Sequence, residues 1–147
     1  MSILKLADNL YISPQLTQSD LLKEAAKLGI RSIICNRPDG EADDQPSFEQ
    51  LKQWLIDTGI DQAVHQPVVA PAINGHDVAT FQKLLATLPI PTLAFCRTGT
   101  RSSLLWAYHQ VQNGMAVSDV ITAAKQAGVD LSNFEANLHA VSQNGMS

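Results

Sequence analysis

Hydrophobic and polar positions change along the chain in short blocks, which predict strands separated by helices. A short β-branched run at 31–35 predicts a buried strand, and the segments 62–68 and 92–95 predict two further strands. Two more apolar runs, 3–6 and 10–12, flank a turn and predict a hairpin. Apolar residues at helical spacing predict helices in the intervals 17–28, 48–56, 77–88 and 102–113, with two more after Ser118 and Ser132. Because strands alternate with helices, we expect an α/β fold with a mainly parallel central sheet of four to five strands, flanked by helices.

Polar residues at the expected starts of helices predict how those helices are capped. Thr17 and Asp20 have the spacing of a capping box. Asp77, Ser118 and Ser132 each precede a periodic apolar segment and are predicted to cap it.

Composition narrows the class of protein further. The 147 residues are 45% hydrophobic, enough for one domain with a sizeable core, so we expect a single domain over 1–147. The 10 Lys and Arg against 14 Asp and Glu give a net charge of −4, which argues against nucleic acid as the main partner. Two cysteines suit a reducing compartment, and no apolar run reaches the ~18 residues of a membrane span. We therefore expect a cytoplasmic protein without a membrane partner.

The segment 92–103 carries the clearest chemical signal. It predicts a strand, a tight loop and the first turn of a helix, where unpaired N–H groups and the helix dipole favour an anion. Cys96 at the base of the loop is the predicted nucleophile, and Arg101 can hold an oxyanion by a bidentate contact. Ser102 would offer a hydroxyl near the sulfur. The predicted anion-binding loop consists of Arg97, Thr98, Gly99, Thr100 and Ser102.

Simpler interpretations exist for each of these residues. A cysteine at the end of a strand is often only a small buried apolar residue. The conjunction of Cys96, Gly99 and Arg101 at a strand–helix junction nevertheless favours a catalytic loop. The second thiol, Cys35, is expected to be buried within a strand.

Two residues after another strand are candidates for a supporting role. Arg37 and Asp39 follow the segment 31–35, and the carboxyl ends of parallel strands share one edge of a sheet. Arg37 could therefore help to hold the anion, or it could simply pair with Asp39. The nearby acidic residues Glu41, Asp43 and Asp44 are expected to form a solvated loop. No Cys or His spacing typical of a metal site is present, and we expect neither a metal nor another cofactor.

The Cys-x-x-Gly-x-Arg-Ser segment resembles the active-site loops of cysteine phosphatases and of rhodanese-type sulfurtransferases. With the segments 9–13, 36–46 and 95–102, the chain resembles the phosphatase-like domain family of beta-lactamase-hydrolase-like proteins over about residues 3–113. This resemblance implies a fold similar to dual-specificity phosphatases, that is, a cysteine-phosphatase-like fold. Some members of the family are joined to a metallo-beta-lactamase-like dioxygenase domain, so the resemblance implies such a dioxygenase as a partner.

Three features distinguish this chain from the phosphatases that it resembles. Four residues separate Cys96 from Arg101, where cysteine phosphatases typically place five and many rhodanese-type enzymes place four. Phe95 stands where phosphatases usually have histidine. The stretch 66–72, which corresponds to their general-acid loop, contains neither Asp nor Glu.

These departures favour sulfur transfer as the main prediction. In that reaction Cys96 would take a sulfur atom from thiosulfate or a persulfide and pass it to a thiol acceptor. The alternative is a phosphatase of the protein-tyrosine or dual-specificity type, which would act on a phosphate ester through a phosphocysteine. A second alternative is an inactive binding module.

Overall fold

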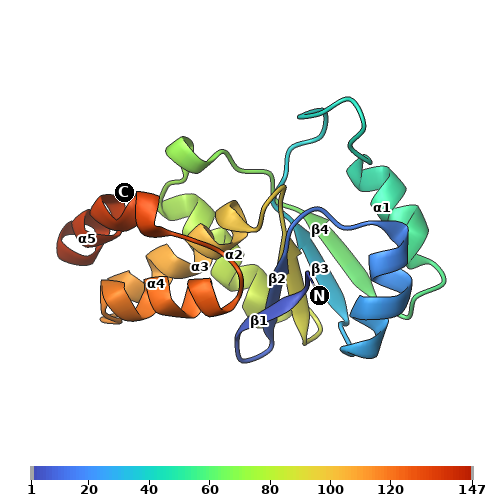
Figure 1. Ribbon diagram of the computed structural model, residues 1–147, viewed down its shortest axis with the longest axis horizontal. Coiled ribbons are helices and arrows are strands. Elements are labelled where there is room, and N and C mark those ends of the chain that lie inside the picture. The colour runs from blue at the N-terminus through green and yellow to red at the C-terminus, as the bar shows by residue number, and fades with distance from the viewer. Residues whose placement is uncertain (1, 147) are drawn as a thin grey trace.

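A five-stranded sheet forms the centre of the protein in the computed structural model, which describes residues 2–146 (Figure 1). The strands are β1 (Leu4–Ala7), β2 (Leu10–Ser13), β3 (Ser32–Cys35), β4 (Gln62–His65) and β5 (Thr92–Phe95). Their order across the sheet is β1-β2-β5-β3-β4. The hairpin of β1 and β2 is antiparallel, and the other three pairings are parallel. The predicted fold class, a mainly parallel sheet with flanking helices, is therefore confirmed.

Helices cover both faces of this sheet. They are η1 (Asp20–Ala25), α1 (Phe48–Leu55), η2 (Ala70–Ala72), α2 (Gly75–Thr87), α3 (Thr100–Gln112), α4 (Val117–Gln126), η3 (Ser132–Phe134) and α5 (Glu135–Asn144). Figure 1 shows α2 to α5 on one side of the sheet, with η1 and α1 on the other. Each side has its own hydrophobic cluster, so the sheet lies between two cores.

The central strand β5 contributes to both cores. Leu93 and Phe95 belong to the cluster beneath η1 and α1, whereas Ala94 belongs to the cluster beneath α2 to α5. All four residues of β5 are buried, and so are all four of β3. Burial on both faces explains why these strands are continuous apolar runs in the sequence rather than alternating ones.

The structure confirms one predicted cap and corrects three. The Thr17 N–H donates to Asp20 Oδ2 at 2.9 Å, and the Asp20 N–H donates to Thr17 Oγ1 at 3.1 Å, as a capping box requires. The cap of α2 is Asn74, and Asp77 completes that helix's capping box from its third position. In a capping box, the N-cap residue and its partner at the third helical position are both polar. Their spacing in the sequence therefore does not show which of the two is the N-cap.

The two later caps were also predicted at the wrong residues. Ser118 lies inside α4, which starts at Val117, and Ser132 opens the short helix η3 rather than α5. Burial of Val117 and Val120 places the start of α4 before Ser118. The helix predicted over 102–113 also starts earlier, at Thr100, so Arg101 belongs to its first turn.

The carboxyl ends of β3, β4 and β5 meet at one edge of the sheet. With β2, which is parallel to β5, four connections leave this edge, at 14–19, 36–47, 66–74 and 96–99, and the longest of them rises above the rest of the molecule in Figure 1. The candidate residues Arg37, Asp39, Cys96 and Arg101 all lie on these connections or directly after them. Among residues 2–146, no helix has both the length and the apolar character needed to cross a membrane.

Candidate active site

Cys96 directly follows β5 and lies at the base of a tight loop. Its side chain is buried, and its Sγ accepts a hydrogen bond from the Gly99 N–H at 3.2 Å. Gly99 has a φ of +88°, in the left-handed region that favours glycine. A Cβ atom at this position would lie 3.1 Å from Val129 Cγ2 and 3.5 Å from the Ser13 carbonyl oxygen. Glycine therefore allows the loop to turn back onto the sulfur.

Helix α3 starts immediately after this turn, as the predicted anion cradle requires. The N–H groups of Thr100, Arg101 and Ser102 lie in its first turn, where the helix offers them no acceptor. The helix dipole adds partial positive charge at the same place. The sulfur of Cys96 and a set of unpaired N–H groups thus share one end of one helix.

The other residues of the predicted loop lie at its surface. Arg97 and Thr98 are exposed, and the Arg97 carbonyl oxygen accepts the N–H of Gln15 at 3.2 Å. The Thr98 and Thr100 hydroxyls lie 3.0 Å apart. The loop is therefore bound to the start of the segment after β2, and the Arg97 side chain faces solvent.

Arg101 is held by an ion pair with a residue from another loop. Its Nη1 donates to Glu41 Oε2 at 2.7 Å, and its Nη2 donates to Glu41 Oε1 at 2.9 Å. Nη1 also donates to the Val68 carbonyl oxygen at 3.1 Å, and only 13% of the Arg101 side chain is exposed. These contacts tie the first turn of α3 to the connections that follow β3 and β4.

One edge of the Arg101 guanidinium is left for a ligand. A guanidinium carries five N–H donors, two on each Nη and one on Nε. Glu41 and Val68 use both donors of Nη1 and one of Nη2, and no acceptor for Nε is found among residues 2–146. The bond to Glu41 raises the pKa of Arg101, and the nearby Cys96 sulfur contributes in the same direction. Among residues 2–146, the Nε–Nη2 edge of Arg101 therefore has no oxygen acceptor, and the Cys96 sulfur lies beside Arg101 and can accept from it.

Arg37 holds the same Glu41 carboxylate that pairs with Arg101. Its side chain is only 6% exposed, its Nε donates to Glu41 Oε1 at 3.0 Å, and its Nη1 donates to Gln15 Oε1 at 3.0 Å. Asp39 does not pair with Arg37 but accepts the N–H of Phe48 at 2.9 Å, at the start of α1. Arg37 thus contacts the site through the carboxylate of Glu41.

Glu41 is the site residue that the sequence did not reveal. We expected it in a solvated loop, but it accepts hydrogen bonds from Arg101 and Arg37. The bond from Arg101, followed by the bond from Arg37, lowers the pKa of Glu41 to about 2. The spacing of four residues between Arg37 and Glu41 is the only trace of this pair in the sequence, and such a spacing is common in any loop.

Ser102 has a different partner from the one that we expected. It is fully buried, and its Oγ donates to Asn36 Oδ1 at 2.7 Å. Asn36 in turn donates through Nδ2 to the Gln66 carbonyl oxygen at 2.9 Å. This chain of bonds connects the start of α3 to the ends of β3 and β4, which fixes the helix against the edge of the sheet.

The two cysteines have different environments. Cys35 is buried, as predicted, and burial is the main cause that raises its pKa to about 12. Its Sγ donates to the Arg37 carbonyl oxygen at 3.5 Å. Cys35 therefore remains a neutral thiol at physiological pH, and Cys96 is the better candidate for a nucleophile.

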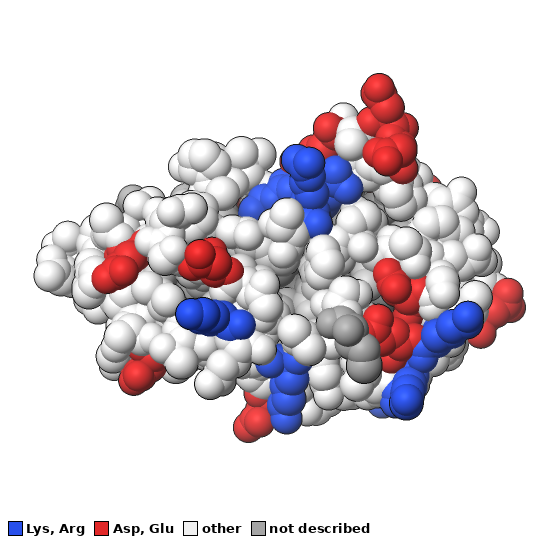
Figure 2. All heavy atoms as spheres, viewed as in Figure 1, with Lys and Arg blue, Asp and Glu red and all other residues white. Residues whose placement is uncertain are grey.

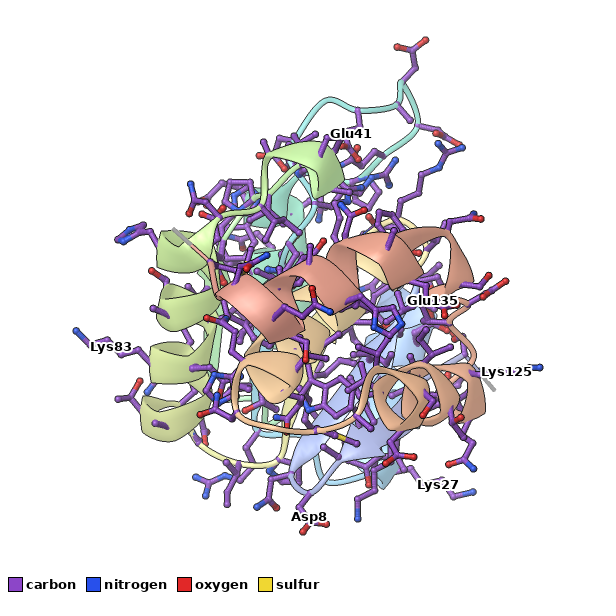
Figure 3. The ribbon with its side chains drawn as sticks, turned by 90° about the vertical axis from the view of Figure 1, so that its left-hand side faces the viewer. Asp8, Lys27, Glu41, Lys83, Lys125 and Glu135 are labelled. Atoms are coloured by element: carbon purple, nitrogen blue, oxygen red, sulfur yellow. The ribbon has the colours of Figure 1, made fainter. Side chains whose placement is uncertain are left out.

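Opposite charges lie side by side around the site. Figure 2 shows a group of basic side chains at the upper edge of the molecule, directly beside a group of acidic ones. Figure 3 labels Glu41 at this upper end, with Asp8 and Lys27 at the opposite end of the molecule. At the site itself, Arg37 and Arg101 share the one carboxylate of Glu41.

A hollow of about 460 Å³ adjoins this network. It shares Gln15 with the Arg37 contacts. Its lining residues are Gln15, Leu16, Thr17, Asp43, Asp44, Gln45, Pro46 and Trp54.

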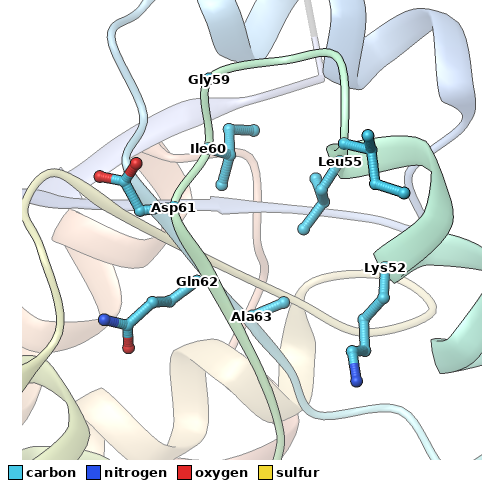
Figure 4. A pocket seen from close by; sticks show the side chains of 8 residues that line it. Lys52, Leu55, Gly59, Ile60, Asp61, Gln62 and Ala63 are labelled. Atoms are coloured by element: carbon cyan, nitrogen blue, oxygen red, sulfur yellow. The ribbon is translucent and has the colours of Figure 1, made fainter.

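A second hollow lies away from the site. Figure 4 shows it between the end of α1 and the start of β4, with a volume of about 420 Å³. Lys52, Leu55 and Asp61 are among its lining residues, and none of the candidate site residues is. In the described part of the chain, no three His, Cys, Asp or Glu side chains gather as ligands for a metal ion.

Residues 3–113 match the family described as the phosphatase-like domain of beta-lactamase hydrolase-like proteins. The chain belongs to this family. The Beta-lactamase hydrolase-like protein of Xylella fastidiosa (strain Temecula1) is 33% identical over 132 residues, which cover 89% of this chain. The match covers 30% of that relative, so this chain spans less than a third of its length.

Solved structures show the same fold. A candidate phosphatase from Neisseria meningitidis Z2491 is 51% identical, covers 95% of this chain and 98% of its own, and has a TM-score of 0.93. The core catalytic domain of the PP-IP phosphatase SIW14 from S. cerevisiae, in complex with citrate, has a TM-score of 0.71 at 15% identity. That match covers 93% of this chain and 83% of SIW14.

The family is that of a phosphatase-like domain, and the Neisseria protein that is 51% identical is described as a candidate phosphatase. They favour phosphate hydrolysis, which we had predicted as the alternative, over sulfur transfer, which we had predicted as the main reaction. The prediction of sulfur transfer gives more weight to the short loop and to the lack of an acid in residues 66–72 than to the resemblance to phosphatases.

Proposed function

We propose that this domain is a phosphatase that hydrolyses a small phosphate compound through a phosphocysteine at Cys96. The observation that carries this proposal is the position of the sulfur. Cys96 Sγ accepts the Gly99 N–H at 3.2 Å, at the start of a helix whose first N–H groups are unpaired, and Arg101 lies beside it. A nucleophile and donors for a tetrahedral anion are thus assembled before the substrate binds.

In the first step, the Cys96 thiolate attacks phosphorus. The bond between Sγ and phosphorus forms while the bond from phosphorus to the leaving oxygen breaks. The N–H groups of the loop and the free edge of Arg101 bind the three peripheral oxygens, where negative charge is greatest in the transition state. Binding at several fixed donors also orients the phosphoryl group in line with the sulfur.

In the second step, water attacks phosphorus and the bond to sulfur breaks. The thiolate is regenerated, and both protons of the water stay with the inorganic phosphate. The same donors stabilise this transition state, because the phosphoryl oxygens occupy the same places. Splitting the reaction in this way replaces one difficult displacement by two easier ones.

Sulfur transfer is the second candidate, supported by the four-residue spacing between Cys96 and Arg101. In that case the adduct on Cys96 would be a persulfide, and a thiol acceptor would remove the sulfur. The thiol acceptor and the dioxygenase partner that we expected from the sequence would take part only if the domain transfers sulfur.

Hydrolysis of p-nitrophenyl phosphate by the whole chain tests the proposal. We expect turnover that Cys96→Ser abolishes, while Cys35→Ser, which changes the buried thiol, retains it. Rapid quenching and intact-mass analysis should then show a phosphoryl adduct on the protein that is absent from Cys96→Ser.

A parallel incubation with thiosulfate separates the two candidates. No hydrolysis of p-nitrophenyl phosphate, combined with a sulfur adduct on Cys96, would replace the phosphatase by a sulfurtransferase.

A further inference from the structure

The carboxyl groups around Cys96 determine which leaving groups this site can expel. An alkoxide is a poor leaving group, so phosphatases that cleave alkyl esters gain from a carboxylic acid that protonates the departing oxygen. Such an acid must be protonated and within hydrogen-bonding reach of that oxygen. The carboxyl groups nearest in the fold lie on the connections at this edge of the sheet. The connection after β2, residues 14–19, contains neither Asp nor Glu.

The connection between β4 and α2 offers no acid. Residues 66–72 contain neither Asp nor Glu, and Val68 contributes its carbonyl oxygen to Arg101. Asp77 comes next along the chain, and its Oδ2 accepts the Asn74 N–H at 3.1 Å in the capping box of α2. This carboxylate serves the start of a helix and not the sulfur.

Glu41 lies closest to the reacting groups but carries no proton. Two nitrogen atoms of Arg101 and one of Arg37 donate to it at 2.7–3.0 Å. With a pKa lowered to about 2 by these bonds, Glu41 is a carboxylate at any pH near neutrality. It can hold Arg101 in place but cannot protonate a leaving group.

The remaining carboxyl groups belong to the loop after β3. Asp39 accepts the Phe48 N–H at 2.9 Å, at the start of α1. Asp43 and Asp44 are exposed at the rim of the neighbouring hollow, and the described residues give neither of them an ion-pair partner. Nothing holds either side chain over the sulfur.

We infer that this site acts on phosphoryl groups whose leaving group departs as a stable anion, as in an acyl phosphate or another phosphoric anhydride, in preference to alkyl phosphate esters. The inference rests on the proposed phosphatase function. The Cys96 sulfur forms its bond to phosphorus, the bond to the bridging oxygen breaks, and the electron pair leaves with a carboxylate or phosphate anion. Because such an anion is stable in water, no proton is required in this step. Water then attacks phosphorus, and the bond from phosphorus to the Cys96 sulfur breaks. Both protons of the water stay on the inorganic phosphate that leaves.

A series of leaving groups tests this inference. General acid catalysis contributes roughly 10²- to 10⁴-fold, and without it the basicity of the leaving group controls the rate. We expect kcat/KM for phenyl phosphate to lie at least about 100-fold below that for p-nitrophenyl phosphate. Acetyl phosphate should be hydrolysed faster than phenyl phosphate, and glycerol phosphate should give no turnover. Cys96→Ser provides the spontaneous rate for each compound.

Two outcomes of this series would overturn the inference in distinguishable ways. Similar kcat/KM values for phenyl and p-nitrophenyl phosphate would show that an acid assists, while the phosphatase proposal would stand. No hydrolysis of any compound, p-nitrophenyl phosphate included, would remove the proposed function and the inference with it.

The pH profile and two variants identify an acid if one exists. We expect kcat/KM for p-nitrophenyl phosphate to reach a plateau as the pH rises, without the alkaline decrease that a required acid produces. Asp43→Asn and Asp44→Asn should leave both the activity and the leaving-group dependence unchanged. A steeper dependence in either variant would identify that residue as the acid and contradict the inference.

Discussion

The carboxylate of Glu41 lies between two arginine side chains, and this arrangement determines how Arg101 is held. Arg101 and Glu41 form a bidentate pair, with distances of 2.7 and 2.9 Å, that leaves the Nε edge of the guanidinium free. Arg37 holds the same carboxylate from its other side at 3.0 Å. Because a guanidinium must be oriented before it can bind a phosphoryl group in two places, Glu41 is a positioning residue for the proposed reaction.

Replacing Glu41 by glutamine should therefore reduce kcat more than binding. Gln keeps the shape of Glu, but its amide nitrogen cannot accept a hydrogen bond from a guanidinium, so the bidentate pair is lost. We expect kcat for p-nitrophenyl phosphate to fall by about tenfold to a hundredfold. KM should not rise, because the change removes a negative charge beside an anion site.

A matched control is Glu49→Gln, which changes an exposed glutamate that pairs with Lys52 on α1. This variant should keep its kcat. A higher KM with an unchanged kcat in Glu41→Gln would show that Glu41 stabilises the bound ground state and the transition state equally and does not position Arg101 for the reaction.

At the scale of the element, the connection from β5 to α3 depends on one backbone conformation. Gly99 has a φ of +88°, and this turn brings its N–H to within 3.2 Å of the Cys96 sulfur. It also starts α3 early enough for Arg101 to lie in the first turn of the helix. The nucleophile and the arginine are thus placed by the same three-residue turn.

Gly99→Ala should damage both stability and activity. A side chain in the left-handed conformation costs about 1–2 kcal/mol, and the new Cβ would also press on Val129 Cγ2 at 3.1 Å. If the loop relaxes to avoid this strain, the N–H leaves the sulfur. We expect a lower free energy of unfolding in urea and a large loss of kcat/KM for p-nitrophenyl phosphate.

Gly59→Ala is the control for the backbone strain alone. Gly59 has a φ of +78°, nothing lies within 4 Å of its Cβ position, and it is remote from Cys96. It should lose a similar free energy of unfolding and keep its activity. Equal activity of the two variants would show that the loop does not need this conformation.

At the scale of the whole molecule, the site depends on a sheet that lies between two cores. Leu93 in β5 is fully buried in the core beneath η1 and α1, and Cys96 follows only three residues later. The partners of β5 are β2 on one side and β3 on the other, so it is the strand that joins the two halves of the sheet. The position of the sulfur is therefore set by packing over most of the protein.

Leu93→Ala should lower the free energy of unfolding by about 2–5 kcal/mol, because it leaves a cavity in a closely packed core. Ile56→Ala removes a side chain that is 73% exposed and should change the free energy by about 0.5 kcal/mol or less. Urea denaturation of the two variants measures the difference. Equal values would mean that β5 is not packed as described.

Much of the fold could be predicted because burial leaves a local trace in the sequence. The strand predicted over 92–95 agrees with β5 at both ends, and the hairpin and the Thr17–Asp20 capping box were also predicted correctly. The order of the strands could not be predicted, because β2, β5 and β3 are distant in sequence and pair only across the sheet. The cap of α2 was misplaced by three residues because Asn74 and Asp77 exchange hydrogen bonds and resemble each other in sequence.

The sequence by itself pointed to Cys96 as the candidate nucleophile, since Cys96, Gly99 and Arg101 are close along the chain and a strand–turn–helix segment brings them together through local geometry. Only the tertiary structure decided what surrounds them. Glu41 is 60 residues from Arg101, and their ion pair exists because β3 and β5 end side by side. The same juxtaposition binds Glu41 as a carboxylate, so this residue cannot protonate a leaving group near neutral pH. Local contacts can be inferred from spacing, whereas contacts across the sheet depend on which strands become neighbours.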